Sequence, residues 1–167
     1  LGVIRQVRTK DRVNLRDILG SSEGLLGNWP VSTKIPVQWG DLDALNHVNH
    51  TVFLTWMETA RMIYFDECGM MDLMESQKIG PILAGIKADY TSPVHFPDTV
   101  TVHTTMSRIG NSSFDMDYRI TSDSNRGQVV ATGTVFGVMC DYSTGKSIPI
   151  TDDLRSRILG VEEMNAD

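Results

Sequence analysis

The chain has little cysteine, no long apolar run and no excess of positive charge. Its 167 residues include two cysteines, too few for a disulfide framework, so we expect a reducing compartment, most simply the cytoplasm. No apolar run approaches the roughly 20 residues that cross a bilayer as a helix. A net charge of −6 argues against a nucleic-acid partner, because binding phosphates requires a basic surface.

The composition is that of an ordinary globular chain, and its length suits one domain. Apolar residues make up 41% and charged residues 22% of the sequence. We place an N-terminal extension at residues 1–30, the domain at 31–160 and a C-terminal tail at 161–167. The extension is locally basic and Arg-rich and could form a short helix. An organelle-targeting segment is the alternative to a plain extension.

Residues 39–61 concentrate the polar chemistry of the chain just before an amphipathic helix. Six ionisable or amide side chains fall within ten residues: Asp41, Asp43, Asn46, His47, Asn49 and His50. Apolar residues then recur at helical spacing, which predicts a helix from about Thr51 to Gly69. The first turn of a helix leaves backbone N–H groups unpaired and attracts negative charge. The sequence therefore gathers carboxylates and imidazoles at a helix N-terminus.

Strands are predicted on both sides of this helix. Residues 34–40 alternate as a strand, which Pro36 assigns to an edge, and residues 70–80 look like a loop or a short helical turn. Four further strands are expected at about 83–91, 99–107, 114–121 and 128–142. The last is apolar on both faces, and its two glycines, Gly133 and Gly137, predict that the helix crosses closely over it. One long helix followed by consecutive strands indicates an α+β fold with an antiparallel sheet.

The motif at the helix start resembles the 4-hydroxybenzoyl-CoA thioesterase family of hotdog-fold proteins. The matching residues are Asp43, His47, Val48, Asn49, Trp56, Glu58, Ala60 and Arg61. The likeness continues from about residue 34 to 159. It implies a single hotdog domain in which an antiparallel sheet of five or six strands wraps a long central helix. It also implies an acyl-CoA substrate, no cofactor, and a homodimer or homotetramer with active sites between subunits.

Hydrolysis of a thioester needs a nucleophile or an activated water, and a donor for the oxyanion. The resemblance selects Asp43 as the carboxylate and the backbone N–H near His50 as the donor. His47 and the His50 side chain are the other catalytic candidates. We assign substrate binding to four more side chains: Asn46, Asn49, Thr51 and Glu58.

Simpler interpretations stay open for several of these residues. Asp41 and Asp43 could cap a turn, and His47 could be a buried structural histidine. Glu58 and Arg61 could form a surface ion pair along the helix, although some hotdog thioesterases use a carboxylate on the helix for catalysis. Related thioesterases that act on acyl-carrier protein have an Asn where this chain has Leu45, which makes His47 a secondary candidate.

A metal site and other activities are the remaining alternatives. Asp41, Asp43, His47 and His50 have a spacing that matches no recognised ligand set, so we expect no metal. The other activities are a hotdog protein that binds acyl thioesters without turnover, a dehydratase, and a thioesterase for acyl-carrier protein. The acyl group is not fixed by the sequence. Candidate pocket residues are Phe53, Trp56, Met57 and Tyr64, with Met71, Leu73 and Met74 filling the core or forming a flexible acyl pocket.

Overall fold

The computed structural model describes residues 13–14 and 29–164, and its elements confirm the α+β class. The strands are β1 (Val13–Asn14), β2 (Val31–Pro36), β3 (Ile79–Tyr90), β4 (Thr99–Ile109), β5 (Ser113–Ser122), β6 (Gln128–Asp141) and β7 (Lys146–Ser147). The helices are α3 (His50–Glu67), α4 (Met70–Gln77) and α5 (Asp152–Glu163), with a short 3-10 turn η1 (Trp39–Asp41). A short helix was expected as possible in the N-terminal extension, but Val13–Asn14 within it form the strand β1, which pairs with β4. The rest of that segment lies outside the described residues.

The described strands form one antiparallel sheet in the order β1-β4-β5-β6-β3. β2 shares the outer edge of β4 with β1, pairing with residues 99–104 while β1 pairs with 108–109. β7 is a two-residue pair on β6. Pro36 lies on an edge strand as predicted, but β2 begins and ends earlier than residues 34–40, because η1 turns the chain at Trp39.

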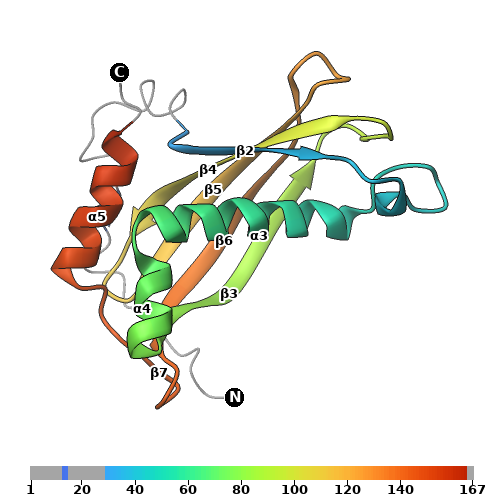
Figure 1. Ribbon diagram of the computed structural model, residues 1–167. Coiled ribbons are helices and arrows are strands. Elements are labelled where there is room, and N and C mark those ends of the chain that lie inside the picture. Colours follow the sequence, from blue (N-terminus) through green and yellow to red (C-terminus); the bar gives the residue numbers. More distant parts are fainter. Residues whose placement is uncertain (1–12, 15–28, 165–167) are drawn as a thin grey trace.

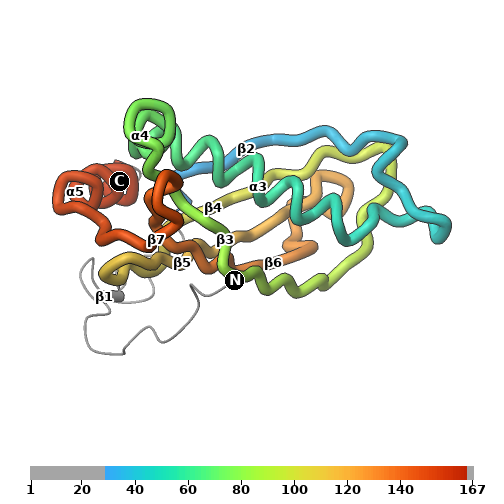
Figure 2. The backbone as a smooth tube through the Cα atoms, turned by 90° about the horizontal axis from the view of Figure 1, so that it is seen from below, coloured from blue at the N-terminus to red at the C-terminus, as the bar shows by residue number. Residues whose placement is uncertain are grey.

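Helix α3 is the longest of the three helices and lies across the sheet (Figure 1). It begins at His50 because the Asn49 side chain caps it, and the left-handed Gly69 (φ 72°) ends it close to the predicted position. Residues 70–77 form a full helix rather than a loop. α5 is capped by the Thr151 side chain, and it continues beyond residue 160 to Glu163. Figure 2 shows α4 and α5 together at one end of the molecule, opposite the loop that precedes α3.

The predicted close approach of α3 to β6 occurs at Gly133. A Cβ atom on this residue would lie 2.8 Å from Cε of Met57 and 2.9 Å from the carbonyl oxygen of Lys87. The same prediction is wrong for Gly137, because a side chain there would overlap the ring of Phe114 from the neighbouring strand. Gly133 therefore leaves space for the helix, and Gly137 leaves space for the Phe114 ring.

β3 is the exposed edge of the sheet. It pairs with β6 on one side, and none of the described strands pairs with its other side. Ile82, Leu83 and Ile86 on this strand are 45%, 48% and 37% exposed. Exposed apolar edge strands favour pairing with another chain. In the part of the chain that the structure describes, no helix is long and apolar enough to cross a membrane.

A buried carboxylate ties α5 to the rest of the fold. Oε1 of Glu162 accepts hydrogen bonds from the Tyr64 hydroxyl (2.6 Å) and the Met106 N–H (2.7 Å), and Oε2 accepts from the Thr105 hydroxyl (2.6 Å). Met106 lies between the parts of β4 that pair with β2 and β1. Glu162 thus satisfies an edge N–H that neither of these strands reaches. Burial raises the pKa of Glu162, although these hydrogen bonds oppose that shift.

Candidate active site

The Asp43 carboxylate lies in a tight turn directly before α3. Its Oδ1 accepts hydrogen bonds from the backbone N–H groups of Leu45 (2.8 Å) and His47 (3.3 Å), and its own N–H donates to the His47 carbonyl (2.8 Å). Asn46 completes the turn in the left-handed conformation (φ 61°). Asp43 therefore occupies a fixed, half-buried position, in which its Oδ2 takes none of the hydrogen bonds formed among the described residues.

The start of α3 has one N–H group available for a ligand. The Asn49 side chain accepts from the N–H of Thr51 (2.9 Å) and from its hydroxyl (2.8 Å), while the Asn49 carbonyl accepts from the N–H of Val52 (2.9 Å). The side chains of Asn49 and Thr51 thus form the helix cap. The first N–H groups of a helix have no acceptor within it. As far as the described residues show, this leaves the N–H of His50 free.

Two residues that the sequence analysis missed support this loop. The His95 ring lies edge-on to the His47 ring, with centroids 4.9 Å apart, and its Nδ1 is 3.0 Å from the Asn46 carbonyl oxygen. The adjacent Val94 accepts a hydrogen bond from the N–H of Val48 (2.8 Å). No periodicity or spacing links residue 95 to residue 47. Only the fold brings the two imidazoles together.

Tyr90 is a third residue of this region that the sequence did not single out. Its hydroxyl donates to the carbonyl oxygen of His50 (3.2 Å), and its ring is 6.4 Å from the His50 ring in an edge-on arrangement. Partial burial raises the pKa of Tyr90, so its hydroxyl is neutral at physiological pH and can donate. The end of β3 therefore holds the start of α3. His50 itself is exposed.

The Asp41 carboxylate takes part in a different turn from Asp43. Its Oδ2 accepts from the backbone N–H of Gln38 (2.8 Å), so it caps η1 as the simpler interpretation expected. Within residues 29–164 no three His, Cys, Asp or Glu side chains are grouped as metal ligands.

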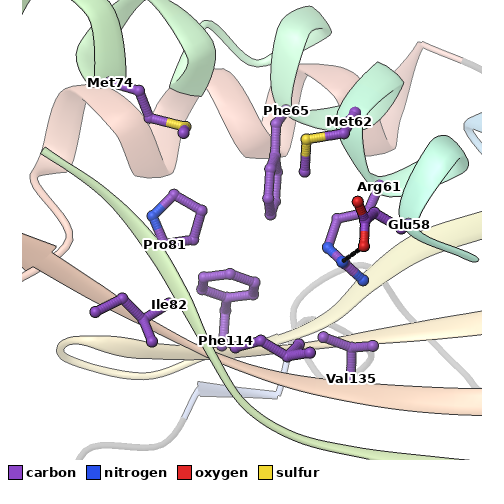
Figure 3. Close-up of a pocket in the computed structure, with 11 residues that line it drawn as sticks. Glu58, Arg61, Met62, Phe65, Met74, Pro81, Ile82, Phe114 and Val135 are labelled. Atoms are coloured by element: carbon purple, nitrogen blue, oxygen red, sulfur yellow. Dashed lines mark ion pairs between the residues drawn. The ribbon is translucent and has the colours of Figure 1, made fainter. Parts of the chain in front are cut away.

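Glu58 and Arg61 lie elsewhere, at a cavity between α3 and β3 (Figure 3). Their charged groups are 3.8 Å apart, but the Glu58 side chain is 66% exposed and that of Arg61 only 10%. The expected ion pair along the helix therefore forms, but only its Glu58 side lies at the surface, because the Arg61 side chain is buried. The structure does not bring Glu58 to the Asp43 turn.

This α3–β3 cavity has a volume of about 220 Å³. Its apolar lining includes Met62, Phe65, Met74, Pro81, Phe114 and Val135. Met74 belongs to the methionines that the sequence singled out, but Met71 and Leu73 are not part of the lining. The other pocket candidates are core residues, at most 4% exposed: Phe53, Trp56, Met57 and Tyr64.

The turn and the cavity lie at opposite ends of the region that α3 spans. His50 begins the helix beside Tyr90 at the end of β3, whereas Pro81 near the beginning of β3 lines the cavity. Eleven residues of helix separate His50 from Arg61, which is roughly 16 Å. Within one chain, the candidate carboxylate and the cavity are therefore well separated.

Comparison with known proteins places the chain in a family. The profile of the thioesterase-like superfamily matches residues 37–158, and the chain belongs to this superfamily of hotdog-fold proteins. The long-chain acyl-CoA thioesterase FadM of Escherichia coli (strain K12) is 26% identical over 128 residues, covering 77% of this chain and 96% of FadM.

Solved structures similar to the chain include two thioesterases. The thioesterase from Thermus thermophilus, complexed with coenzyme A and Zn, is 32% identical with a TM-score of 0.72, covering 82% of this chain and 97% of that one. The DHNA-CoA thioesterase from Staphylococcus aureus has a TM-score of 0.71 at 23% identity, with 81% and 92% covered, and shows likeness of fold. The 4-hydroxybenzoyl-CoA branch of the superfamily is not singled out by these matches.

Proposed function

We propose that this protein hydrolyses acyl-CoA thioesters to the free acid and coenzyme A, with Asp43 as the catalytic carboxylate. The observation that carries the proposal is the position of Asp43, fixed in a turn just ahead of the open N–H of His50, in a chain of the thioesterase-like superfamily. The acyl-CoA thioesterase FadM and the coenzyme A complex of the Thermus relative support CoA as the carrier. Acyl-carrier protein is the alternative carrier.

In this mechanism the helix N-terminus polarises the thioester carbonyl. The N–H of His50 donates to the carbonyl oxygen and to the oxyanion that develops, and such a donor is typically worth ~3 to 4 kcal/mol. The positive end of the helix dipole acts in the same direction. The two N–H groups on Oδ1 of Asp43 orient the carboxylate. Oδ2 then attacks the carbonyl carbon or removes a proton from the attacking water.

The other site residues take supporting roles in the proposal. Asn46 and Asn49 hold the turn and the cap, and Thr51 completes that cap. His47, whose ring packs against His95, and His50, whose ring lies near Tyr90, are the secondary catalytic candidates. Glu58, next to the cavity, is the alternative carboxylate on the helix.

We further propose a homodimer that joins two β3 edges. Ile82, Leu83 and Ile86 give this edge an apolar surface, and closed two-fold assemblies are the commonest solution for such surfaces. A two-fold axis makes the two β3 strands antiparallel. The cavity of one chain, near Pro81, then lies beside the His50 end of the second copy. The dimer would thus unite in one site the two features that a single chain keeps apart. A homotetramer would be a pair of such dimers.

The test is release of free thiol from a panel of acyl-CoA and acyl-carrier-protein thioesters that covers short, long and aromatic acyl groups. We expect turnover of at least one acyl-CoA. Turnover of acyl-carrier-protein thioesters alone would identify acyl-carrier protein, and not coenzyme A, as the carrier of the acyl group. Saturable binding of coenzyme A esters without any turnover would instead identify a non-catalytic acyl-thioester-binding protein.

A further inference from the structure

We propose that the α3–β3 cavity binds the far end of the acyl group, and that the Phe114 ring, seated on Gly137, is the floor that limits its length. The inference rests on the proposed function and adds a substrate class. The acyl group ends in an uncharged apolar part no larger than a substituted aromatic ring or a chain of about nine carbons.

The polarity of the lining selects the chemistry of the occupant. Glu58 and Arg61 are the charged side chains of the lining, and the rest is aliphatic, aromatic or thioether. Transfer of a charged or unpaired polar group into such a space costs several kcal/mol. The far end of the acyl group is therefore hydrocarbon.

The exposure of the lining residues distinguishes the open side of the cavity from its closed side. Ile82 and Leu83, on the free edge of the sheet, are 45% and 48% exposed, so the cavity opens on this side. Phe65, Phe114 and Val135 are at most 1% exposed and form the closed side. Figure 3 shows Phe65 reaching down from the helix towards the Phe114 ring, with Glu58 and Arg61 to one side of both. A chain that enters from the β3 edge therefore ends against these two rings.

The volume sets the scale of the occupant. A cavity of about 150 Å³ lined by aliphatic and aromatic residues binds benzene, with its six carbons. In the same proportion, the cavity of about 220 Å³ holds about nine carbons. This is enough for a substituted aromatic ring or a medium chain, but not for the whole of a long fatty acyl chain.

Phe114 and Gly137 set the depth together. The two residues face each other in the pairing of β5 with β6, and a side chain on Gly137 would overlap the Phe114 ring. The ring also packs edge-on against Phe65, with centroids 5.9 Å apart at 89°. Enlarging residue 137 pushes the ring into the cavity, whereas shrinking residue 114 opens the floor. Opposite changes in length preference are therefore expected from the two substitutions.

The experiment measures binding of S-alkyl-CoA thioethers, which cannot be hydrolysed, by calorimetry with the full chain. The alkyl group is lengthened stepwise from two carbons to stearyl length. Each methylene that enters the cavity is expected to tighten binding about fourfold, until the floor is reached and the gain stops. For Phe114→Leu the gain should stop about two to three carbons later, close to the difference in side-chain carbons between Phe and Leu. For Gly137→Ala the gain should stop earlier than in the unaltered protein, because the added methyl group pushes the Phe114 ring into the cavity.

Two matched variants control for strain and lost stability. Gly133→Ala lies on the same strand beneath α3 and also meets a close contact, but it does not line the cavity. Ile120→Ala removes a fully buried side chain from the same strand as Phe114, also outside the lining. Both should leave the stopping length unchanged. If Gly137→Ala fails to fold, the shift in Phe114→Leu decides alone.

Two outcomes would overturn the inference. One is a gain in affinity that continues to stearyl length in the unaltered protein. The other is a stopping length that Phe114→Leu leaves unchanged or that the control variants shift equally. Binding of the thioethers with the expected stopping lengths, but without turnover of any acyl-CoA, would refute the proposed hydrolysis and leave the cavity assignment standing.

Discussion

The two ends of α3 are built in different ways. At its N-terminal end, Oδ1 of Asp43 and the Asn49 side chain accept hydrogen bonds from backbone N–H groups within four residues of themselves. At its other end, buried Tyr64 binds Glu162, which is 98 residues away in the chain. The first end is largely solvent-accessible and carries the candidate chemistry. The second is closed and carries the cavity and the contact with α5.

Under the proposed function, the catalytic group at the start of α3 and the acyl-binding cavity at its other end are separate parts of this chain. The local turn can orient a carboxylate without help from the core, so changes at the N-terminal end should alter rates more than stability. The distant end is embedded in the core, so changes there should alter stability or length preference more than rates. The following predictions test this division.

The largest effect is expected from Asp43→Asn. This substitution keeps the shape of the side chain but removes the charge needed for attack or proton removal. We expect kcat to fall by ~10²-fold or more, with a much smaller change in KM, because the helix N-terminus and the cavity are untouched. Steady-state thiol release from an accepted acyl-CoA measures both constants.

Asp41→Asn and Glu58→Gln are the comparison variants, since Asp41 caps η1 and Glu58 lies at the cavity. Near-full activity in Asp43→Asn with an inactive Glu58→Gln would move catalysis to the helix.

A single turnover in ¹⁸O-labelled water separates direct attack by Asp43 from activation of water by Asp43. Label in the Asp43 carboxylate indicates an anhydride intermediate, and label only in the released acid favours general-base hydrolysis.

The next largest effect is expected from breaking the proposed dimer, which brings the start of α3 in one chain beside the cavity of the other. Ile86→Lys places a charge on the β3 edge outside the cavity lining, and like charges facing across an interface cost several kcal/mol. We expect light scattering to show a monomer and kcat/KM to fall by roughly tenfold or more, as the site loses its second half.

Val129→Lys is the matched control, because Val129 is equally exposed at 37% but lies on β6 outside the pairing with β3. A fully active monomer of Ile86→Lys would show that one chain contains the whole site. A monomer in the unaltered protein at micromolar concentration would contradict the dimer itself.

A smaller effect, on stability alone, is expected at the buried end. Tyr64→Phe removes the hydroxyl that donates to Glu162 (2.6 Å), and hydrogen bonds to charged groups contribute ~1.5 to 3 kcal/mol. Urea unfolding should show a loss of this size, while kcat/KM stays within about twofold, because Tyr64 does not line the cavity. Tyr142→Phe, which loses an exposed bond to the Pro81 carbonyl, should cost less. Equal losses of unfolding free energy in the two variants would show that burial does not strengthen the hydrogen bond between Tyr64 and Glu162.

The smallest effect is a pH dependence of that stability. Burial raises the pKa of Glu162 above its ordinary value of 4.5, so the folded state holds the proton more tightly than the unfolded state. Its contribution to stability is therefore complete below the ordinary pKa and is lost as pH rises through the raised pKa. Urea unfolding measures the free energy of unfolding of the unaltered protein and of Glu162→Gln. As pH increases, the value for the unaltered protein should fall relative to the value for Glu162→Gln. A difference that moves the other way would mean that the hydrogen bonds to the carboxylate outweigh its burial.

Much of the architecture was predictable because it follows from local rules. Alternation predicted β4 and β5, a run that is apolar on both faces predicted β6, and the apolar periodicity placed α3. Gly69 also ends α3 close to the predicted position. Residues 70–77 were harder, because an eight-residue helix carries too little periodic signal to be told from a loop.

The sequence by itself determined the family motif, the α+β class and the position of the candidate carboxylate before α3, since these depend on residues close together in the chain. The tertiary structure decided which apolar residues enclose a cavity, that His95 lies against His47, and that Glu162 is buried against Tyr64. These contacts join segments that no local propensity relates. Burial and pairing are properties of the folded sheet and its helices, so they exist only once distant strands have been brought into register.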